Sequence, residues 1–205
     1  MPFFASLIRG RLLSVFVLGA LSLVFSGSVF AGLMNADFSS GFDNWNGELV
    51  DTFGPLPVDP ATEGDFYSII PNGARLTTSD VNPDVFVVSL FQDFTVDSIA
   101  SGSTLELSLS VSAAADDAFA QLRDLDGILP TVDLLGGGTF DITAWAGANA
   151  TLEFSVSDVF FDFPDELEVS NIAFTEIPRA DVPAPAPLAL LAIACVVFAR
   201  RLQRA

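Results

Sequence analysis

The stretch that decides the fold is Thr104-Leu-Glu-Leu-Ser-Leu-Ser-Val-Ser112, in which polar and apolar residues alternate without a break. Successive side chains of an extended chain point to opposite faces, so this pattern predicts a β-strand with one apolar face. Residues 150–156 repeat the alternation, and residues 85–96 form a longer, β-rich segment that we expect to be more deeply buried. These three segments are the expected centre of a β-rich domain.

Shorter candidate strands surround this centre, at residues 66–70, 74–77, 118–123, 128–134 and 169–177. Turn-forming sequences such as Pro71-Asn72-Gly73 and Gly136-Gly137-Gly138 separate them. Many short strands without a helical period between them predict an antiparallel β-sandwich, because each strand offers one apolar face to the space between two sheets. With 20 Phe residues against two Trp and one Tyr, phenylalanine is the expected core filler.

The first 31 residues have the features of a secretory signal peptide. Arg9 and Arg11 precede an apolar run at residues 12–25, and Val29-Phe30-Ala31 provides suitable side chains for signal peptidase. We therefore predict cleavage after Ala31. The alternative is an uncleaved anchor, which the short apolar run and the good cleavage site disfavour.

The other end of the chain has three parts in a row. Val182-Pro183-Ala184-Pro185 opens a proline-rich spacer, twelve apolar residues follow at 188–199, and the chain closes with Arg200, Arg201 and Arg204. Prolines keep a spacer extended, and arginines stay on the cytoplasmic side of a membrane. We predict a signal peptide (1–31), a β-sandwich (32–178), a linker with a sorting motif (179–187) and a transmembrane tail (188–205).

Charge and composition exclude several classes of function. The 26 acidic residues lie between Asp37 and Asp181, where only Arg75, Arg123 and Arg179 oppose them, which gives this part a net charge of −23. Such a surface does not favour nucleic acid, whose binding needs cationic side chains. Its natural counterions are cations, of which calcium is the extracellular candidate, although acidic charge also simply keeps proteins soluble.

Catalytic chemistry has little support in this composition. The chain has no His and no Lys, and its one cysteine is Cys195 in the apolar tail. This excludes Ser-His-Asp and Cys-His pairs, a Schiff-base lysine and a His/Cys zinc site. Paired carboxylates remain formally open, but nothing selects one pair. We expect a protein that is not an enzyme.

The arrangement of leader, β-domain, short proline motif, apolar segment and terminal arginines resembles the PEP-CTERM sorting-signal proteins of Gram-negative bacteria. The family's Val-Pro-Glu-Pro motif stands here as Val182-Pro183-Ala184-Pro185, with Ala184 in place of Glu. The resemblance implies export through the inner membrane, processing by an exosortase-type enzyme, and delivery to the cell surface or extracellular matrix. The twelve apolar residues are fewer than the ~20 of a stable span, which suits a transient tail.

A second resemblance concerns the body. The segment from Leu33 through Asn35, Asp37, Phe38 and Gly41 to Trp45 is similar to the opening of galactose-binding-like jelly rolls. Three later segments match the order of that fold's closing strands: Phe140 to Gly147, Thr151 to Phe154, and Val169 to Phe174. The resemblance implies an antiparallel jelly roll.

The same resemblance implies a structural calcium held by Asn35, Asp37 and Asn171. Ser39 and Ser170 replace two of that family's usual carboxylates. The alternative is that these Asn and Asp side chains cap backbone amides at strand ends.

Three further features could bind ligands. Asp124-Leu125-Asp126-Gly127 is similar to the start of a calcium loop but lacks a later bidentate Glu, so a turn explains it better. Asp116-Asp117 and the segment from Asp162 to Glu168 are acidic loops that could bind calcium weakly, although solvated surface loops explain them better. Sugar stacking requires exposed aromatic rings, for which Trp45, Trp145 and Tyr67 are the candidates. The jelly-roll resemblance places Trp45 and Trp145 in the core, which leaves Tyr67 undecided.

The sequence leaves two main functions, with a hydrolase of unknown type as a third and less supported one. The first is a non-enzymatic surface or biofilm-matrix protein, exported and processed at its tail. The second is a carbohydrate-binding module that recognises extracellular polysaccharide.

Overall fold

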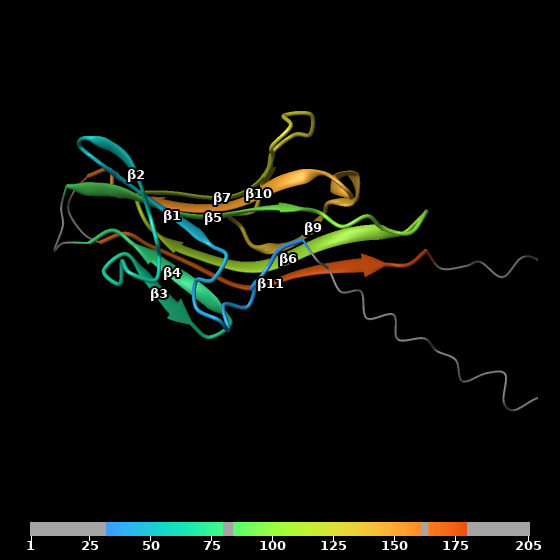
Figure 1. Ribbon diagram of the computed structural model, residues 1–205, viewed down its shortest axis with the longest axis horizontal. Coiled ribbons are helices and arrows are strands. Elements are labelled where there is room, and N and C mark those ends of the chain that lie inside the picture. The colour runs from blue at the N-terminus through green and yellow to red at the C-terminus, as the bar shows by residue number, and fades with distance from the viewer. Residues whose placement is uncertain (1–31, 80–83, 161–163, 180–205) are drawn as a thin grey trace, which may run out of the picture.

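The computed structural model describes residues 32–79, 84–160 and 164–179, which form a sandwich of two antiparallel sheets (Figure 1). Sheet A has the strand order β2-β1-β5-β10-β7-β8, and sheet B has the order β3-β4-β11-β6-β9. β1 and β2, β3 and β4, and β7 and β8 are sequential neighbours, whereas the central pairs β1–β5, β5–β10, β4–β11 and β11–β6 join strands that are far apart in sequence, as in a jelly roll. The expected all-β, antiparallel jelly-roll class is confirmed.

The strand bounds follow in chain order. Sheet A contains β1 (Asn46–Asp51), β2 (Gly54–Val58), β5 (Val85–Thr95), β7 (Asp117–Asp124), β8 (Val132–Asp133) and β10 (Asn149–Ser157). Sheet B contains β3 (Tyr67–Ile70), β4 (Gly73–Thr77), β6 (Thr104–Ala114), β9 (Gly138–Asp141) and β11 (Glu166–Ile177). A single 3-10 turn, η1 (Thr143–Trp145), is the one helical element among the described residues.

Most of the predicted strands are present. The deciding stretch lies within β6, residues 150–156 lie within β10, and residues 85–96 coincide with β5 apart from their last residue. The prediction for 128–134 is wrong in extent, since only Val132–Asp133 pairs, with Leu122 and Gln121 of β7. The strands β1, β2 and β9 were not expected from alternation.

The core lies between the sheets. Leu105 and Leu107 of β6 and Leu152, Phe154 and Val156 of β10 are all buried and belong to the same core cluster. Leucine and valine supply most of this core. Phenylalanine contributes Phe38, Phe42, Phe66, Phe94 and Phe154, while three other Phe side chains are exposed, so the expectation of a Phe-filled core is only partly right.

The open edges of both sheets are short strands, from two to five residues long. The longest of them, β2, carries Pro55 and Pro57 at alternate positions and pairs with β1 in unbroken register. Proline has no N–H and is tolerated on an edge strand where its nitrogen faces away from the sheet. The outer margin of β2 therefore lacks two amide donors.

The predicted leader, sorting motif and tail lie outside the described residues. These include Ala31, the motif at 182–185, and Arg200, Arg201 and Arg204. In the part of the chain that the structure describes, no helix combines the length and apolarity needed to cross a bilayer.

Candidate functional site

The opening loop is organised by Asn35. Its Nδ2 donates to the carbonyls of Gly41 (2.9 Å) and Asp43 (3.1 Å), and its Oδ1 accepts the Ser40 amide (3.1 Å). The Asn35 carbonyl also accepts the Trp45 indole N–H at 3.2 Å. These bonds use both ends of the Asn35 side chain, so this residue holds the loop shape that places Trp45 in the core.

The other two predicted calcium ligands also bond locally. Asp37 Oδ1 accepts the amide and hydroxyl of Ser39, and these bonds hold the pKa of its exposed carboxyl below the usual value. Asn171 lies at a bulge in β11 with φ of 56°, and its amide side chain reaches Ser110 and Ser170. Asn35 and Asp37 thus each accept a backbone amide, as the capping alternative expects, whereas the Asn171 side chain contacts serine hydroxyls instead.

The three aromatic residues considered for sugar stacking are all buried. Tyr67 and Trp145 are each 3% exposed, and Trp45 is 4% exposed. The Tyr67 hydroxyl donates to the Ser89 carbonyl at 2.8 Å, and burial raises the pKa of this phenol. The prediction that Tyr67 or Trp145 stacks on a sugar is therefore wrong, because neither ring face is accessible. The core placement of Trp45 and Trp145 is confirmed.

The loop at Asp124 is a turn held by a carboxylate. Asp124 Oδ1 accepts the Asp126 amide (3.1 Å), and Oδ2 accepts the amides of Ile128 (2.6 Å) and Leu129 (2.7 Å). These backbone donors, with Leu129 foremost, lower the pKa of Asp124. Gly127 adopts a left-handed φ of 68°. Since both carboxylate oxygens are occupied by amides, the turn explanation of this sequence is the better one.

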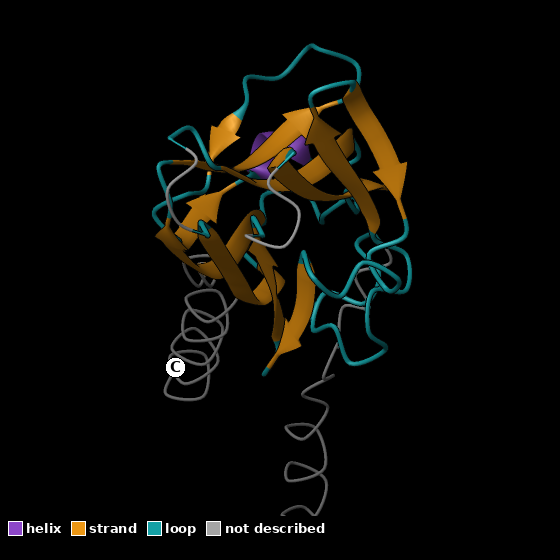
Figure 2. Ribbon diagram, turned by 90° about the vertical axis from the view of Figure 1, so that its left-hand side faces the viewer, coloured by secondary structure: helices purple, strands orange, loops and turns teal. Residues whose placement is uncertain are grey.

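Three carboxylates meet at the end of the sandwich that carries the β6–β7 and β10–β11 connections, which Figure 2 views end-on. Asp116, Asp158 and Asp165 each place one oxygen within 4.8 Å of the other two, and Asp165 is buried. Carboxylate oxygens are calcium ligands, so these three acidic side chains could hold a divalent cation. Two of them come from acidic loops predicted separately, whereas Asp158 was missed.

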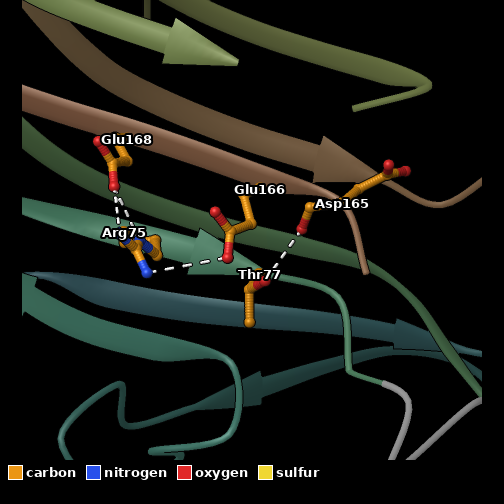
Figure 3. A network of polar contacts seen from close by, with 5 residues as sticks. All are labelled: Arg75, Thr77, Asp165, Glu166 and Glu168. Carbon is orange, nitrogen blue, oxygen red and sulfur yellow. Dashed lines mark hydrogen bonds and ion pairs between the residues drawn. The ribbon is translucent and has the colours of Figure 1, made fainter. Parts of the chain in front are cut away.

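The backbone fixes Asp165 beside a polar row on sheet B (Figure 3). Its carbonyl accepts the Thr77 hydroxyl at 3.1 Å, and its carboxylate points away from Arg75. Arg75 lies between Glu166 and Glu168, with Nε 2.9 Å from Glu168 and Nη1 3.8 Å from Glu166. The hydrogen bond to Glu168 is the main reason that the pKa of Arg75 is raised. This ion-pair row stabilises β4 against β11.

The outer face of sheet A is the second candidate site, and we call it the A face. Alternation places the core residues of β5, β7 and β10 inward and leaves the next residue of each strand outward. The outward side chains at its centre are Val87, Ser89, Phe91 and Asp93 of β5, Phe119, Gln121 and Arg123 of β7, and Thr151, Glu153 and Ser155 of β10; Glu48, Asp117 and Asp133 lie at its margins.

Polar side chains along the centre of the A face are already paired with one another. The Ser89 and Ser155 hydroxyls are 2.9 Å apart, the Thr151 hydroxyl donates to Asp93 at 2.6 Å, and Gln121 donates to Glu153 at 2.8 Å. Ser155 has no exposed area at all, although it faces outward. The centre of the A face is therefore a dense and ordered polar floor.

Two phenylalanine rings flank this floor from opposite sides of β10. Phe91 pairs with Glu153, and Phe119, which is 37% exposed, pairs with Ser155. Two strand spacings and a two-residue offset put their Cα atoms roughly 12 Å apart. Phe91 is half-buried by its neighbours, yet it is absent from the aromatic and aliphatic side chains that pack on the core. The A face thus combines separated apolar rings with hydrogen-bonding groups between them.

A small cavity lies where the opening segment crosses between the sheets. Its volume is about 150 Å³, and Leu33, Phe94, Leu105, Ile172 and Phe174 supply most of its apolar wall. Binding pockets for drug-sized ligands usually enclose at least ~300 Å³. This cavity is therefore smaller than a typical ligand site.

Comparison with known proteins adds the following. No family model and no curated protein matches the sequence. The fold is similar to the enzymatically active domain of bacteriophage CBA120 tailspike protein 4, at 12% identity and a TM-score of 0.44, over 71% of this chain and 21% of that one. The chain therefore spans about a fifth of that domain.

Two further solved structures are similar. One is described as CBM4 structure and function, with 13% identity, a TM-score of 0.38, and coverage of 68% of this chain and 99% of that one. The other is an exo-β-agarase, with 10% identity, a TM-score of 0.30, and coverage of 68% and 23%. Similarity at this level concerns the fold alone.

Proposed function

We propose that this chain is an exported, non-enzymatic protein whose A face binds extracellular polysaccharide. The observation that supports the proposal is the pair Phe91 and Phe119 beside a floor of paired polar side chains. The C–H faces of sugar rings pack on aromatic rings, while their hydroxyls need planar amides, carboxylates and hydroxyls as partners. Binding sites commonly join an apolar surface to a few fixed polar groups in this way.

Preorganisation favours the same function. The side chains of Thr151, Glu153 and Ser155 are held by neighbours on β5 and β7 before any ligand arrives. Binding then costs little additional side-chain entropy, which is ~0.5–1.5 kcal/mol for each mobile side chain that must be ordered. A flat, rigid face suits an extended polymer better than a small molecule, which needs a concave pocket.

The export part of the proposal rests on the two ends of the sequence. The leader before Gly32 directs the chain across the inner membrane, and the tail after Asp181 retains it there until an exosortase-type enzyme cuts near Val182–Pro185. The product is a protein of the cell surface or extracellular matrix, where polysaccharide is abundant. The alternative is a structural matrix protein that binds no sugar.

The binding test uses the full chain in mild detergent, run through native gels that contain a panel of soluble polysaccharides. We expect at least one polysaccharide to retard the protein. Phe91→Ala and Phe119→Ala should each weaken retardation by about tenfold, since an aromatic contact of ~1 kcal/mol or more is lost.

The control is Phe53→Ala, which removes a more exposed ring that lies outside the A face. Phe53 is 96% exposed at the turn between β1 and β2. Its removal should leave retardation unchanged. Retardation by no polysaccharide, or equal loss in all three variants, would favour the structural alternative.

The processing test is mass spectrometry of the mature protein from the native host. We expect an N-terminus at Gly32 and a C-terminus near Val182–Pro185. A secreted product that still ends in Arg204 and Ala205 would contradict the sorting proposal but leave the binding proposal intact.

A further inference from the structure

The rings of the A face are bordered by carboxylates. Phe91 lies directly across from Glu153 on β10, two residues from Asp93 on its own strand, and diagonal to Glu48 on β1. Cross-strand partners are ~5 Å apart and diagonal ones ~7–8 Å apart, which is within reach of one ligand group. Phe91 is therefore an aromatic ring with acidic groups on three sides.

The second ring has a similar setting. Phe119 lies between Asp117 and Gln121 on β7, and Gln121 pairs with Asp133 of β8. The A face thus carries five carboxylates, at Glu48, Asp93, Asp117, Asp133 and Glu153. The opposing cation at its centre is Arg123, whose Nη2 is 3.8 Å from Glu153 and whose side chain is 53% exposed. The net charge of the face is strongly negative.

An aromatic ring beside ionised carboxylates favours a positively charged ligand group. A cation over a ring gains ~0.5–1 kcal/mol at an exposed site, and a nearby carboxylate adds ~1 kcal/mol or more at ~4 Å. The same carboxylates repel uronate or sulfate groups. Combined with hydroxyl and amide partners on the floor, these charges define the chemistry of the ligand.

We propose that the A face recognises a polysaccharide with free amino groups, that is, a polymer of unacetylated or partly acetylated amino sugars. This inference rests on the proposed function and adds the ligand class to it. Ammonium groups of the polymer lie beside Phe91 and Phe119, against Glu153, Asp93 and Glu48. Sugar hydroxyls contact Gln121 and the floor.

A basic peptide is the competing source of ammonium groups, and the position of the site disfavours it. β10 is paired with β5 and β7 from Ala150 to Ser157, and β5 is paired with both β10 and β1 from Val87 to Phe91, so the main chain at the centre of the A face is already in ladder hydrogen bonds. Peptides that bind sheets usually pair with an open edge instead. An amino-sugar polymer needs only side-chain partners.

The test compares two ligands that differ only in acetylation, the hexamer of N-acetylglucosamine and its fully deacetylated form. Calorimetric titration of the full chain at pH 6, where Asp and Glu are ionised and the amines are protonated, should show about tenfold tighter binding of the deacetylated hexamer. This preference should shrink as salt rises from about 0.05 M to about 0.5 M, because Asp93, Asp117 and Asp133 are solvent-exposed and their attraction for an ammonium group is screened.

The variants locate the preference on the A face. Glu153→Gln keeps the shape and the bond from Gln121, and Asp93→Asn is similarly conservative. Each should reduce the preference to about threefold or less. Glu106→Gln on the outer face of sheet B is the matched control and should retain the full preference. A thermal melt of each variant verifies the fold.

Each result decides between the proposals. Equal binding of both hexamers, lost in Phe91→Ala, overturns the amino-sugar inference and leaves the polysaccharide proposal standing. If neither hexamer binds but another polysaccharide does, the amino-sugar inference is likewise overturned and the polysaccharide proposal still stands. Binding of poly-L-lysine as tightly as the deacetylated hexamer, with the same dependence on Phe91, overturns both and makes the A face a peptide site.

Discussion

The two sheets have the same alternating geometry, but the outward side chains that accompany their charged residues differ. The outer face of sheet B, here the B face, carries small polar groups such as Ser68, Ser108, Ser110 and Thr175, with Arg75 neutralising Glu166 and Glu168. The A face carries phenylalanine at the equivalent outward positions of β5 and β7. A Ser/Thr surface is an ordinary solvated sheet face, whereas outward rings over an ordered polar floor are not needed for folding. This difference is the reason for proposing the A face, and not the B face, as the binding surface.

The largest expected effect tests whether the A face is held rigid from beneath. Gln92 of β5 points inward, where its Nε2 donates to the Met34 and Asn44 carbonyls and its Oε1 accepts the Met34 amide. Gln92→Leu should lower the free energy of unfolding by about 2–3 kcal/mol, because three hydrogen bonds are lost near the core.

Denaturant unfolding followed by tryptophan fluorescence measures this change, since the opening segment carries Trp45. Gln121→Leu, which removes a single outward hydrogen bond from the same sheet, should cost less than about 1 kcal/mol. Equal costs would mean that the opening segment does not support β5.

The second effect compares the two faces directly with the same substitution. Ser155→Leu places a large side chain where the wild-type residue has no exposed area, and should destabilise by about 1–2 kcal/mol through overpacking. Ser110→Leu on the B face replaces an exposed serine and should stay within about 0.5 kcal/mol. Similar losses of unfolding free energy in urea for Ser155→Leu and Ser110→Leu would mean that the A face is no more tightly packed than the B face.

The third effect concerns the contact that joins the sheets. Tyr67 belongs to sheet B, but its hydroxyl bonds to the Ser89 carbonyl beneath the A face. Tyr67→Phe should cost about 1 kcal/mol at pH 7, the usual net value of one hydrogen bond.

This phenol also gives a pH dependence with a definite sign. Burial raises the pKa of Tyr67 in the folded state, so the folded state keeps its proton at a pH where the unfolded state, near the ordinary value of 10.0, has lost it. The resulting stability is complete below pH 10 and is lost as the pH rises above 10 toward the folded-state pKa. Tyr67→Phe should flatten that loss. Tyrosinate absorbance follows this group alone, because the chain has one tyrosine and no lysine.

The smallest effect compares the two arginines. Arg75 on the B face makes two ion pairs with a 39% exposed side chain, whereas Arg123 on the A face makes one long pair and is 53% exposed. Arg75→Ala should cost at most about 1 kcal/mol, and Arg123→Ala about 0–0.5 kcal/mol. Thermal melts at low and high salt measure both, and the difference should narrow at high salt. A larger loss for Arg123→Ala would assign the A face a structural role.

The sequence predicted the strands well where one face is apolar and the other polar. Over residues 104–112 of β6, every second residue is apolar and the residues between them are polar. The alternation therefore defines both the strand and its buried face. In β5, apolar residues lie on both faces of the strand: Val87 and Phe91 point outward, and Val88 and Leu90 point into the core. Alternation alone could not place Phe91 outward, and for this reason the A face was missed.

For Phe119 a usable signal existed. Ala120 and Leu122 set the inward phase of β7, which leaves Phe119, Gln121 and Arg123 outward. Interpreting Phe119 as core filler by its hydrophobicity ignored the phase of its neighbours. The group of Asp116, Asp158 and Asp165 had no such signal, because loops that are about 40 residues apart meet only through the strand order of the two sheets.

The prolines of β2 have a consequence for many copies of this protein crowded together. A sheet margin with free amides can template the addition of another chain and so start fibrous aggregation. Pro55 and Pro57 remove two of those donors from the longest open margin of the sandwich. Strand addition is therefore disfavoured at the β2 edge of sheet A, where a second chain would find two fewer amide donors.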